Sequence, residues 1–291
     1  MPSPALLLNL ALDLCSRQRQ PRVPEPALLM ADAASAASFM QAGREDGILA
    51  HTYLYHAIQA SAVIPAGAQV VDLGCGPANQ LALIARLNPD CRFVGIDAAD
   101  SMLVLAGETL ARQQLHNVEL RHDDMSALGT VETASADVVI STMSLHHLAD
   151  VAALERTLME AKRILKPGGG VYLVDFGRLK REATQHFFAT ERRATQPEPF
   201  TEDYYNSLRA AFSLGEIRHA AAPFGNGVQI KRTFLVPLLI AIRSARSHEP
   251  RAVTRAAARA SYAALSPRQQ YDFRDLARFF RHGGFGLAFK P

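Results

Sequence analysis

Cysteine is scarce in this sequence, which has only Cys15, Cys75 and Cys91 among its 291 residues. They form no Cys-x-x-Cys pair and no His/Cys cluster at the spacing of zinc ligands, so the sequence indicates neither a disulfide framework nor a structural metal. We therefore expect a chain with no metal ion, in a reducing compartment such as the cytoplasm.

Long apolar runs are lacking as well. After the first twenty residues the only one covers residues 234–242, contains Pro237, and is less than half as long as a bilayer crossing requires. The first twenty residues have no basic residue ahead of their apolar run, and Asn9 and Asp13 interrupt it, which argues against a signal peptide. We expect no membrane segment.

A strong excess of one charge is also missing. The chain has 31 basic and 28 acidic residues, a formal charge of +3, which is too small to imply a polyanionic partner. Arg251, Arg255 and Arg259 form a basic stripe at helical spacing; we interpret it as a solvated helix face, with an anion or RNA contact as the alternative. We expect no nucleic-acid partner.

Apolar residues make up 48% of the chain, enough for a sizeable core. Residues 1–66 contain no convincing strand and predict a helical N-terminal cap, with a short first helix and further helices near 27–42 and 46–62. From residue 67 the pattern changes to short strands that alternate with helices. The predicted strands are 69–73, 91–96, 118–121, 136–141 and 170–175, and the predicted helices between them are about 79–87, 100–115 and 151–165. This alternation indicates a doubly wound α/β domain with a mostly parallel sheet.

Beyond residue 175 the alternation loosens. We expect helices near 178–194 and 201–212, strands near 215–221 and 231–242, and two helices after residue 248. Ser266, Pro267 and Gln269 form the N-terminal signature of the second tail helix, and Gly283 ends it. The predicted domains are therefore a cap (1–66), a main domain (67–245) with an inserted lid (176–213), and a helical C-terminal extension (246–291).

A glycine turn follows the first predicted strand, in the segment Val70-Val71-Asp72-Leu73-Gly74-Cys75-Gly76. Glycines here let a ligand approach the backbone at the start of a helix. The third glycine of the dinucleotide fingerprint is replaced by Asn79, and the carboxylate of Asp72 would oppose a pyrophosphate but suit a cationic amino group. The turn therefore disfavours NAD.

Carboxylates also end the next two strands. Asp97 can accept hydrogen bonds from ribose hydroxyls, and Asp123 or Asp124 from an adenine amino group. Together with the turn they predict a crevice for an adenosine without phosphates.

These segments resemble, in order and spacing, the motifs of class I S-adenosylmethionine-dependent methyltransferases. The matching pieces are residues 71–76, Gly95-Ile96-Asp97, Asp123-Asp124-Met125, residues 141–148 and Leu165-Lys166-Pro167-Gly168-Gly169. The resemblance covers about residues 65–242. It implies a seven-stranded sheet with the last strand antiparallel, and S-adenosylmethionine as cofactor.

The resemblance also implies roles for single residues. Gly74 and Gly76, with Cys75 between them and Asp72 before them, would line the methionine part of the cofactor, and the Ser141 backbone its amino-acid end. Asp97 would hold the ribose and Ala98 and Met102 the adenine face. Asp124, with the Met125 amide nearby, would hold the adenine amino group, with Asp123 as the alternative.

His146 and His147 follow the fourth strand, where a methyl acceptor must lie, and are the predicted catalytic residues. The first can serve as a general base or only shape and hydrogen-bond the acceptor. Aromatic residues on the second cap helix and after the fifth strand would supply the acceptor pocket or, alternatively, core packing. They are His51, Tyr53, Tyr55, His56, Phe187, Phe188, Phe200, Tyr204 and Tyr205, with Tyr53, His146, Phe188 and Tyr204 as the predicted acceptor contacts.

The acceptor is expected to be a small, apolar or aromatic molecule. The segment after the fourth strand has no Asn/Asp-Pro-Pro-aromatic motif and no Pro-Cys nucleophile, which argues against methylation of nucleic-acid bases. Two other functions stay open: a catalytically silent, cofactor-binding subunit and, less favoured, an NAD-dependent oxidoreductase. The N-terminal leucines and the Phe-rich tail helix would also allow a homodimer.

Overall fold

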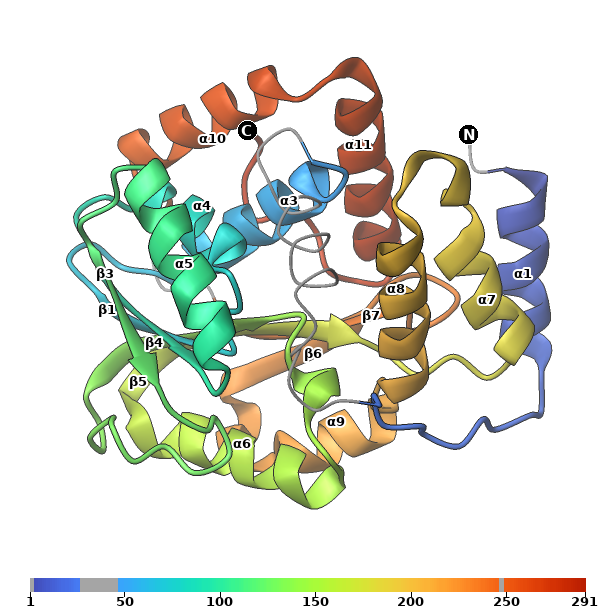
Figure 1. Ribbon diagram of the computed structural model, residues 1–291, viewed down its shortest axis with the longest axis horizontal. Coiled ribbons are helices and arrows are strands. Elements are labelled where there is room, and N and C mark those ends of the chain that lie inside the picture. Colours follow the sequence, from blue (N-terminus) through green and yellow to red (C-terminus); the bar gives the residue numbers. More distant parts are fainter. Residues whose placement is uncertain (1–2, 27–46, 246–248) are drawn as a thin grey trace.

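The computed structural model describes residues 3–26, 47–245 and 249–291, so the helix predicted near 27–42 lies outside the described residues. Its centre is a seven-stranded sheet of order β3-β2-β1-β4-β5-β7-β6 (Figure 1). The strands are β1 (Gln69–Leu73), β2 (Arg92–Asp97), β3 (Val118–His122), β4 (Ala136–Thr142), β5 (Leu165–Phe176), β6 (Val228–Arg232) and β7 (Leu239–Ser244). The five strands predicted before residue 176 and the parallel sheet are confirmed.

Strand direction sets where the functional residues gather. Strands β1 to β5 all run in the same direction, and β7 is antiparallel to both β5 and β6. The last strand is thus the antiparallel one, as the resemblance implied. Because the first five strands share a direction, the loops that follow β1, β2, β4 and β5 meet at one edge of the sheet.

Alternate strand residues enter two separate cores. In β1, Val70 packs into the cluster that contains Tyr55 and Phe93, whereas Val71 packs into the cluster that contains Leu154. Helices therefore cover both faces, as buried parallel strands require. Helices α3 (Ala50–Ser61), α4 (Asn79–Leu87), α5 (Asp100–Arg112) and α10 (Ala252–Ala264) lie on one face, and α6 (Val151–Ile164) and α9 (Leu214–Ala220) on the other (Figure 1).

Four further helices complete the fold, and the last of them packs on α3, where Phe280 stacks on Tyr55. They are α1 (Pro4–Cys15), α7 (Glu182–Thr190), α8 (Glu198–Ala210) and α11 (Pro267–His282), with short 3₁₀ turns at Leu145–His147, Arg193–Thr195 and Ala222–Gly227. Ser266 and Gln269 form the predicted capping box of α11, and Gly283 ends it. In the part of the chain that the structure describes, every helix is too short or too polar to span a bilayer.

Two predicted elements are wrong. Residues 215–221 form no strand; they belong to α9, because Ser213 and Glu216 make a capping box and Ile217 and Ala220 are buried one helical turn apart. Residues 231–242 are not one strand either. Two strands, β6 and β7, flank a turn that holds Pro237, which lacks the amide hydrogen that a ladder needs, and Leu235, whose φ is +68°.

Candidate active site

A cavity of about 760 Å³ opens at the carboxyl edge of the sheet. One end is lined by the glycine turn after β1 and by residues that follow β2 and β3, and the other by the residues after β4 and the aromatic side chains of α7 and α8. A volume of this size is typical of sites for small molecules.

The glycine turn forms the first wall. Gly74 has φ +71° and lies so close to Ser144 that a Cβ atom would be 2.5 Å from the Cβ of that serine. Gly76 has φ +52° and faces open space. Its amide donates to Oδ2 of Asp97 over 2.8 Å, while Oδ1 of Asp97 accepts from the amide of Ala99 over 2.9 Å. Asp97 thus joins the turns after β1 and β2.

Most of the residues predicted to bind the cofactor line this cavity. They are Gly74, Cys75, Gly76, Asp97, Ala98, Met102, Asp123, Asp124 and Met125. Asp72 and Ser141 do not line it. The Ser141 hydroxyl donates to the carbonyl of Leu73 over 2.8 Å and so ties β4 to β1 behind the cavity wall.

Asp72 is a buried carboxylate with 2% exposure, and its Oδ1 has no hydrogen-bond partner among the described residues. Burial raises the pKa of Asp72 well above its ordinary value, and the neighbouring charge of Asp97 adds to the effect.

Asp123 and Asp124 differ in their bonding. Both carboxylate oxygens of Asp123 are used within their own loop, where they accept from the amide of Asp124 and from the amide and hydroxyl of Thr130. Asp124 accepts from the amide of Ser126 through Oδ1. More acceptor capacity therefore remains on Asp124.

At the other end of the cavity, His146 is held by Asp175, the residue before the last one of β5. The backbone amide of His146 donates to Oδ2 over 2.9 Å, and Nδ1 of its ring lies 2.6 Å from Oδ1. A carboxylate only accepts, so the ring carries its hydrogen on Nδ1 when neutral. Burial disfavours protonation of His146, but the carboxylates of Asp175 and Glu25 outweigh it and raise the pKa of the imidazole.

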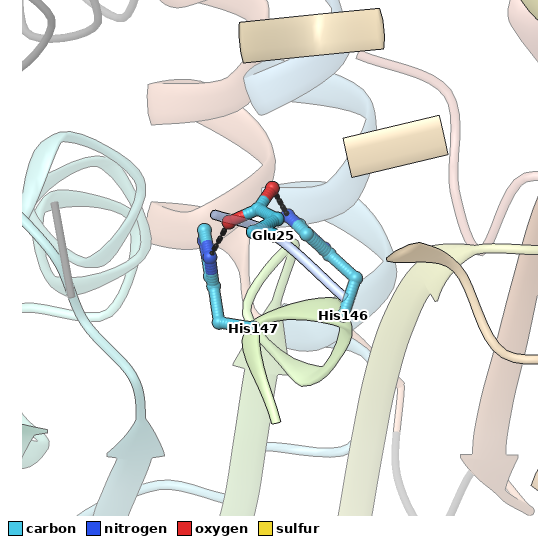
Figure 2. Close-up of side chains that lie close together, drawn as sticks. All are labelled: Glu25, His146 and His147. Carbon is cyan, nitrogen blue, oxygen red and sulfur yellow. Dashed lines mark hydrogen bonds and ion pairs between the residues drawn. The ribbon is translucent and has the colours of Figure 1, made fainter. Parts of the chain in front are cut away.

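The carboxylate of Glu25 also lies beside His146, although Glu25 precedes that residue by 121 positions in the chain. Its carboxylate bonds Nδ1 of His147 and lies 3.7 Å from Nε2 of His146, between the two rings (Figure 2). Ser207 of α8 donates to it over 2.8 Å. Burial opposes ionisation of Glu25, but the bond from His147 and the charges of both histidines lower its pKa to about 2. We call Glu25, His146 and His147 the Glu–His–His cluster.

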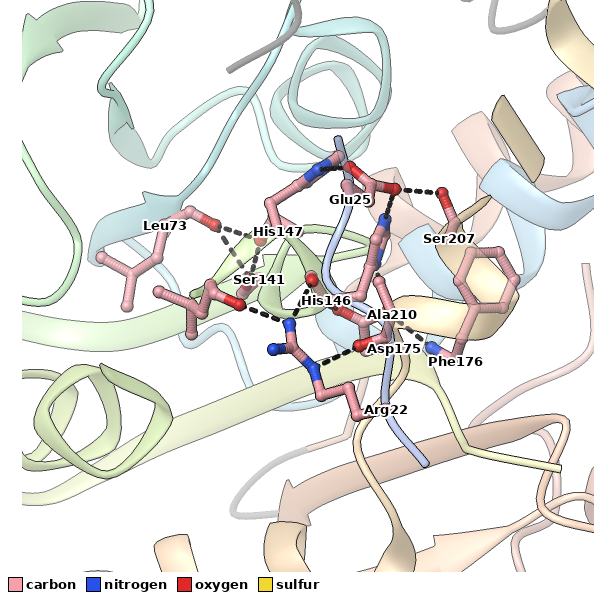
Figure 3. A network of polar contacts seen from close by, with 12 residues as sticks. Arg22, Glu25, Leu73, Ser141, His146, His147, Asp175, Phe176, Ser207 and Ala210 are labelled. Atoms are coloured by element: carbon pink, nitrogen blue, oxygen red, sulfur yellow. Dashed lines mark hydrogen bonds and ion pairs between the residues drawn. The ribbon is translucent and has the colours of Figure 1, made fainter. Parts of the chain in front are cut away.

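Arg22 fastens the segment that carries Glu25. Its guanidinium donates to the carbonyls of Ala210 and His146, at 2.6 and 2.9 Å, and to those of Leu148 and Ala149 (Figure 3). It also stacks 4.2 Å from the ring centre of Phe212. Residues 21–26, which lie between the first predicted helix and the one predicted near 27–42, therefore contribute to the site.

Four residues of the site were not predicted from the sequence: Arg22, Glu25, Asp175 and Asp203. Asp175 could have been found, because it lies at the carboxyl end of a parallel strand, as Asp97 does. Asp203 lies in α8 and lines the cavity, and burial together with the charge of Glu25 raises its pKa. Glu25 and Arg22 carry no such signal, since only the folded chain brings them to β4.

The predicted aromatic surface divides into two groups. His51, Tyr53, Phe188, Phe200 and Tyr204 line the cavity, as the functional interpretation expects. Tyr55 and His56 are instead core residues with at most 1% exposure, and Tyr55 stacks on Phe280 with ring centres 5.2 Å apart. Phe187 and Tyr205 do not line the cavity either.

Comparisons with known proteins point to one enzyme family. A family model described as a methyltransferase domain matches residues 64–211. The chain is 35% identical over 150 residues to trans-aconitate 2-methyltransferase of Azoarcus sp. strain BH72, covering 48% of this chain and 55% of the relative. It is 32% identical over 110 residues to demethylmenaquinone methyltransferase of Listeria monocytogenes serotype 4a, covering 38% and 45%. The matches thus span about half of each relative's length.

Among solved structures, a SAM-dependent methyltransferase from Aquifex aeolicus aligns with TM-score 0.53 and 16% identity, covering 73% of this chain and 97% of that one. At this level of identity the similarity concerns the fold alone.

Proposed function

The chain belongs to the class I S-adenosylmethionine-dependent methyltransferases, and from this premise we propose that it methylates a small, partly apolar molecule bound beside the Glu–His–His cluster. The observation that carries the proposal is the single cavity, which joins the glycine turn to this cluster.

The residues at the glycine turn fit S-adenosylmethionine. The position that a Cβ of Gly76 would take is open, so a ligand can approach the backbone there. Each oxygen of Asp97 accepts one amide hydrogen and keeps a lone pair that a ribose hydroxyl can use. Asp97 would hold the ribose, and Asp124, with Ala98, Met102 and the Met125 amide, the adenine. Gly74, Cys75 and Gly76 would line the methionine part, with Asp72 and the Ser141 backbone behind them.

The lining of the acceptor end supports a partly apolar acceptor. It includes Phe176, Phe188, Phe200, Tyr204 and Phe279, and Tyr53 reaches the cavity from α3. The named substrates of the two curated relatives, trans-aconitate and demethylmenaquinone, are themselves small organic molecules. Residues 176–213 would act as the lid that excludes water from the acceptor.

The bound cofactor supplies a methyl group already activated by its positive sulfur, so the protein's task is mainly alignment. His146 and His147 are the proposed catalytic residues, since they lie where the reacting atom of the acceptor must be. Asp175 fixes the ring of His146 so that Nε2 points toward Glu25 and the cavity. Tyr53, Phe188 and Tyr204 would bind the body of the acceptor.

Cofactor binding can be measured without knowing the acceptor. Isothermal titration should detect S-adenosylmethionine and its demethylated product, and Asp97→Ala should weaken both about tenfold or more, because it removes charge-assisted hydrogen bonds. Asp100→Ala is the matched control, since that side chain is 89% exposed three residues later. Equal affinity of Asp97→Ala and the unsubstituted chain would contradict the ribose assignment.

The acceptor class is tested with methyl-labelled cofactor and a cell extract separated by size. We expect the label in compounds below about 1 kDa, the range that a cavity of this class accommodates. Label confined to protein or nucleic acid would overturn the proposed acceptor class but not the methyltransferase family.

A further inference from the structure

We propose that the Glu–His–His cluster binds a divalent transition-metal ion through one carboxylate oxygen of Glu25, Nε2 of His146 and Nδ1 of His147. Two imidazoles and one carboxylate are a ligand set that first-row metals such as zinc, iron and cobalt accept.

The ligand atoms are already gathered. One atom from each of the three side chains lies within 4.8 Å of the others (Figure 2). Ligands bound to a common metal at about 2.1 Å lie roughly 3–4 Å apart, so only small side-chain movements separate this arrangement from a coordinated one. The rings of His146 and His147 have centres 4.2 Å apart, and Glu25 contacts Nδ1 of His147 and lies 3.7 Å from Nε2 of His146.

Two of the three ligands are also held by other side chains. Asp175 accepts from Nδ1 of His146, the carboxylate–histidine contact that commonly orients a metal ligand. Ser207 holds Glu25, and Arg22 fixes its segment against the carbonyl of His146. Figure 3 shows these contacts converging on the cluster from residues 22–25, β5 and α8. An arrangement fixed before the ion arrives lowers the cost of binding it.

The charges around the cluster call for a cation. Asp175 and Glu25 expose only 2% and 6% of their side chains, and Asp203 acts on both histidines from α8. The nearby guanidinium of Arg22 donates its hydrogen bonds to backbone carbonyls. A divalent ion bound by the cluster would offset the negative charge of these carboxylates while both imidazoles remain neutral ligands.

The metal would act on the acceptor, a step that rests on the proposed function. Three protein ligands leave coordination positions open toward the cavity, where an acceptor hydroxyl can bind and lose its proton to solvent water at neutral pH before residues 176–213 exclude water from the site. Its oxygen then forms the new bond to the methyl carbon while the carbon–sulfur bond breaks and its electron pair stays on sulfur. The ion assists without changing oxidation state.

Metal binding is tested on the whole chain without cofactor or acceptor. After treatment with a chelator, titration with Co²⁺ should give one equivalent bound and a visible absorption band of nitrogen and oxygen coordination. Glu25→Gln and His147→Gln should each weaken Co²⁺ binding at least tenfold, and Asp175→Asn, which acts through His146, should weaken it about 10–100-fold. His219→Gln is the control, because that surface histidine is likewise paired with a glutamate, Glu155, at 3.5 Å.

Melting temperatures with and without Co²⁺ separate binding from folding defects. The ion should raise the melting temperature of the unsubstituted chain and of His219→Gln but not of Glu25→Gln or His147→Gln. Absence of stoichiometric binding, or equal Co²⁺ affinity in Glu25→Gln, would overturn the metal site. Neither result bears on S-adenosylmethionine binding, which the Asp97→Ala variant tests separately.

Discussion

Asp72 combines two properties that rarely occur together in a residue kept only for stability. Its carboxylate is buried, and Oδ1 has no hydrogen-bond partner among the described residues. A buried charge without a partner destabilises the folded chain. It lies two residues before the glycine turn, where the positively charged amino group of the cofactor would offset its charge.

Asp72→Asn should therefore stabilise the free protein and weaken cofactor binding. Folding raises the pKa of Asp72 above 3.8, so the folded chain resists deprotonation and stability falls as the pH rises through the raised pKa. At pH 8 we expect Asp72→Asn to unfold with a free energy higher by about 1–3 kcal/mol, with the difference vanishing near pH 4.

Urea unfolding at both pH values measures the stability effect, and calorimetry should show S-adenosylmethionine binding about tenfold more weakly. A variant that is less stable at both pH values and binds the cofactor normally would contradict this role of Asp72.

Single residues differ in how far the sequence predicts them. Asp97 and His146 were predicted because they follow strands whose order a motif fixes, and parallel strands bring their ends together. Glu25 could not be predicted, because its distance to His147 depends on how residues 16–26 cross the surface. No local periodicity encodes that path; the contacts of Arg22 with distant carbonyls determine it.

Among the elements, α3 is unusual because both of its faces are buried. Ten of its residues are buried, among them Tyr55 and His56. Nδ1 of His56 lies 2.6 Å from the hydroxyl of Tyr172 in β5, a polar contact within an apolar core. Burial, aided by His51, lowers the pKa of His56 to about 3.

The buried His56 predicts acid sensitivity of the α3–sheet contact. Below pH 6.5 His56 is protonated in the unfolded chain but stays neutral in the folded chain. The free energy of unfolding therefore falls as the pH decreases from 6.5 toward 3. The contribution is at most about 1.4 kcal/mol per pH unit. Urea unfolding at pH 7, 6 and 5 should show a shallower loss for His56→Gln than for the control His116→Gln, which changes an exposed histidine. Equal slopes would contradict this prediction.

Elements beyond β5 were harder to predict than those before it. The capping box of α9, Ser213 with Glu216, is a helix signal in the sequence that the strand prediction for residues 215–221 did not take into account. The division of residues 231–242 into β6 and β7 depends on the turn around Pro237, whose position only the antiparallel pairing reveals. Before β5, the glycine turns and the crossover helices mark where each strand ends and the next begins. Few other assignments of helices and strands are possible there, so those elements were predicted well.

At the scale of the whole molecule, the cavity is closed by parts far apart in sequence. Arg192, which follows α7, makes two 2.9 Å bonds to Asp272 of α11, and both residues line the cavity. Residues 176–213 and α11 are thus joined beside the cavity. Sequence analysis predicted both elements but not their contact, because amphipathic helices do not specify which surface they cover.

A double-mutant cycle on the Arg192–Asp272 ion pair tests whether this contact stabilises the fold and the acceptor end of the cavity. The side chain of Asp272 is only 6% exposed and bound at both oxygens, so Arg192→Gln and Asp272→Asn should show a coupling of about 1–3 kcal/mol in urea unfolding. The control pair, Arg193 with Glu198, is 66% and 80% exposed and should show almost no coupling. Because the pair lies in the cavity wall, Arg192→Gln should also raise the KM for the acceptor while leaving cofactor affinity unchanged. If the stability losses of Arg192→Gln and Asp272→Asn add up in the double variant and the KM for the acceptor is unaltered, residues 176–213 and α11 close the site independently of each other.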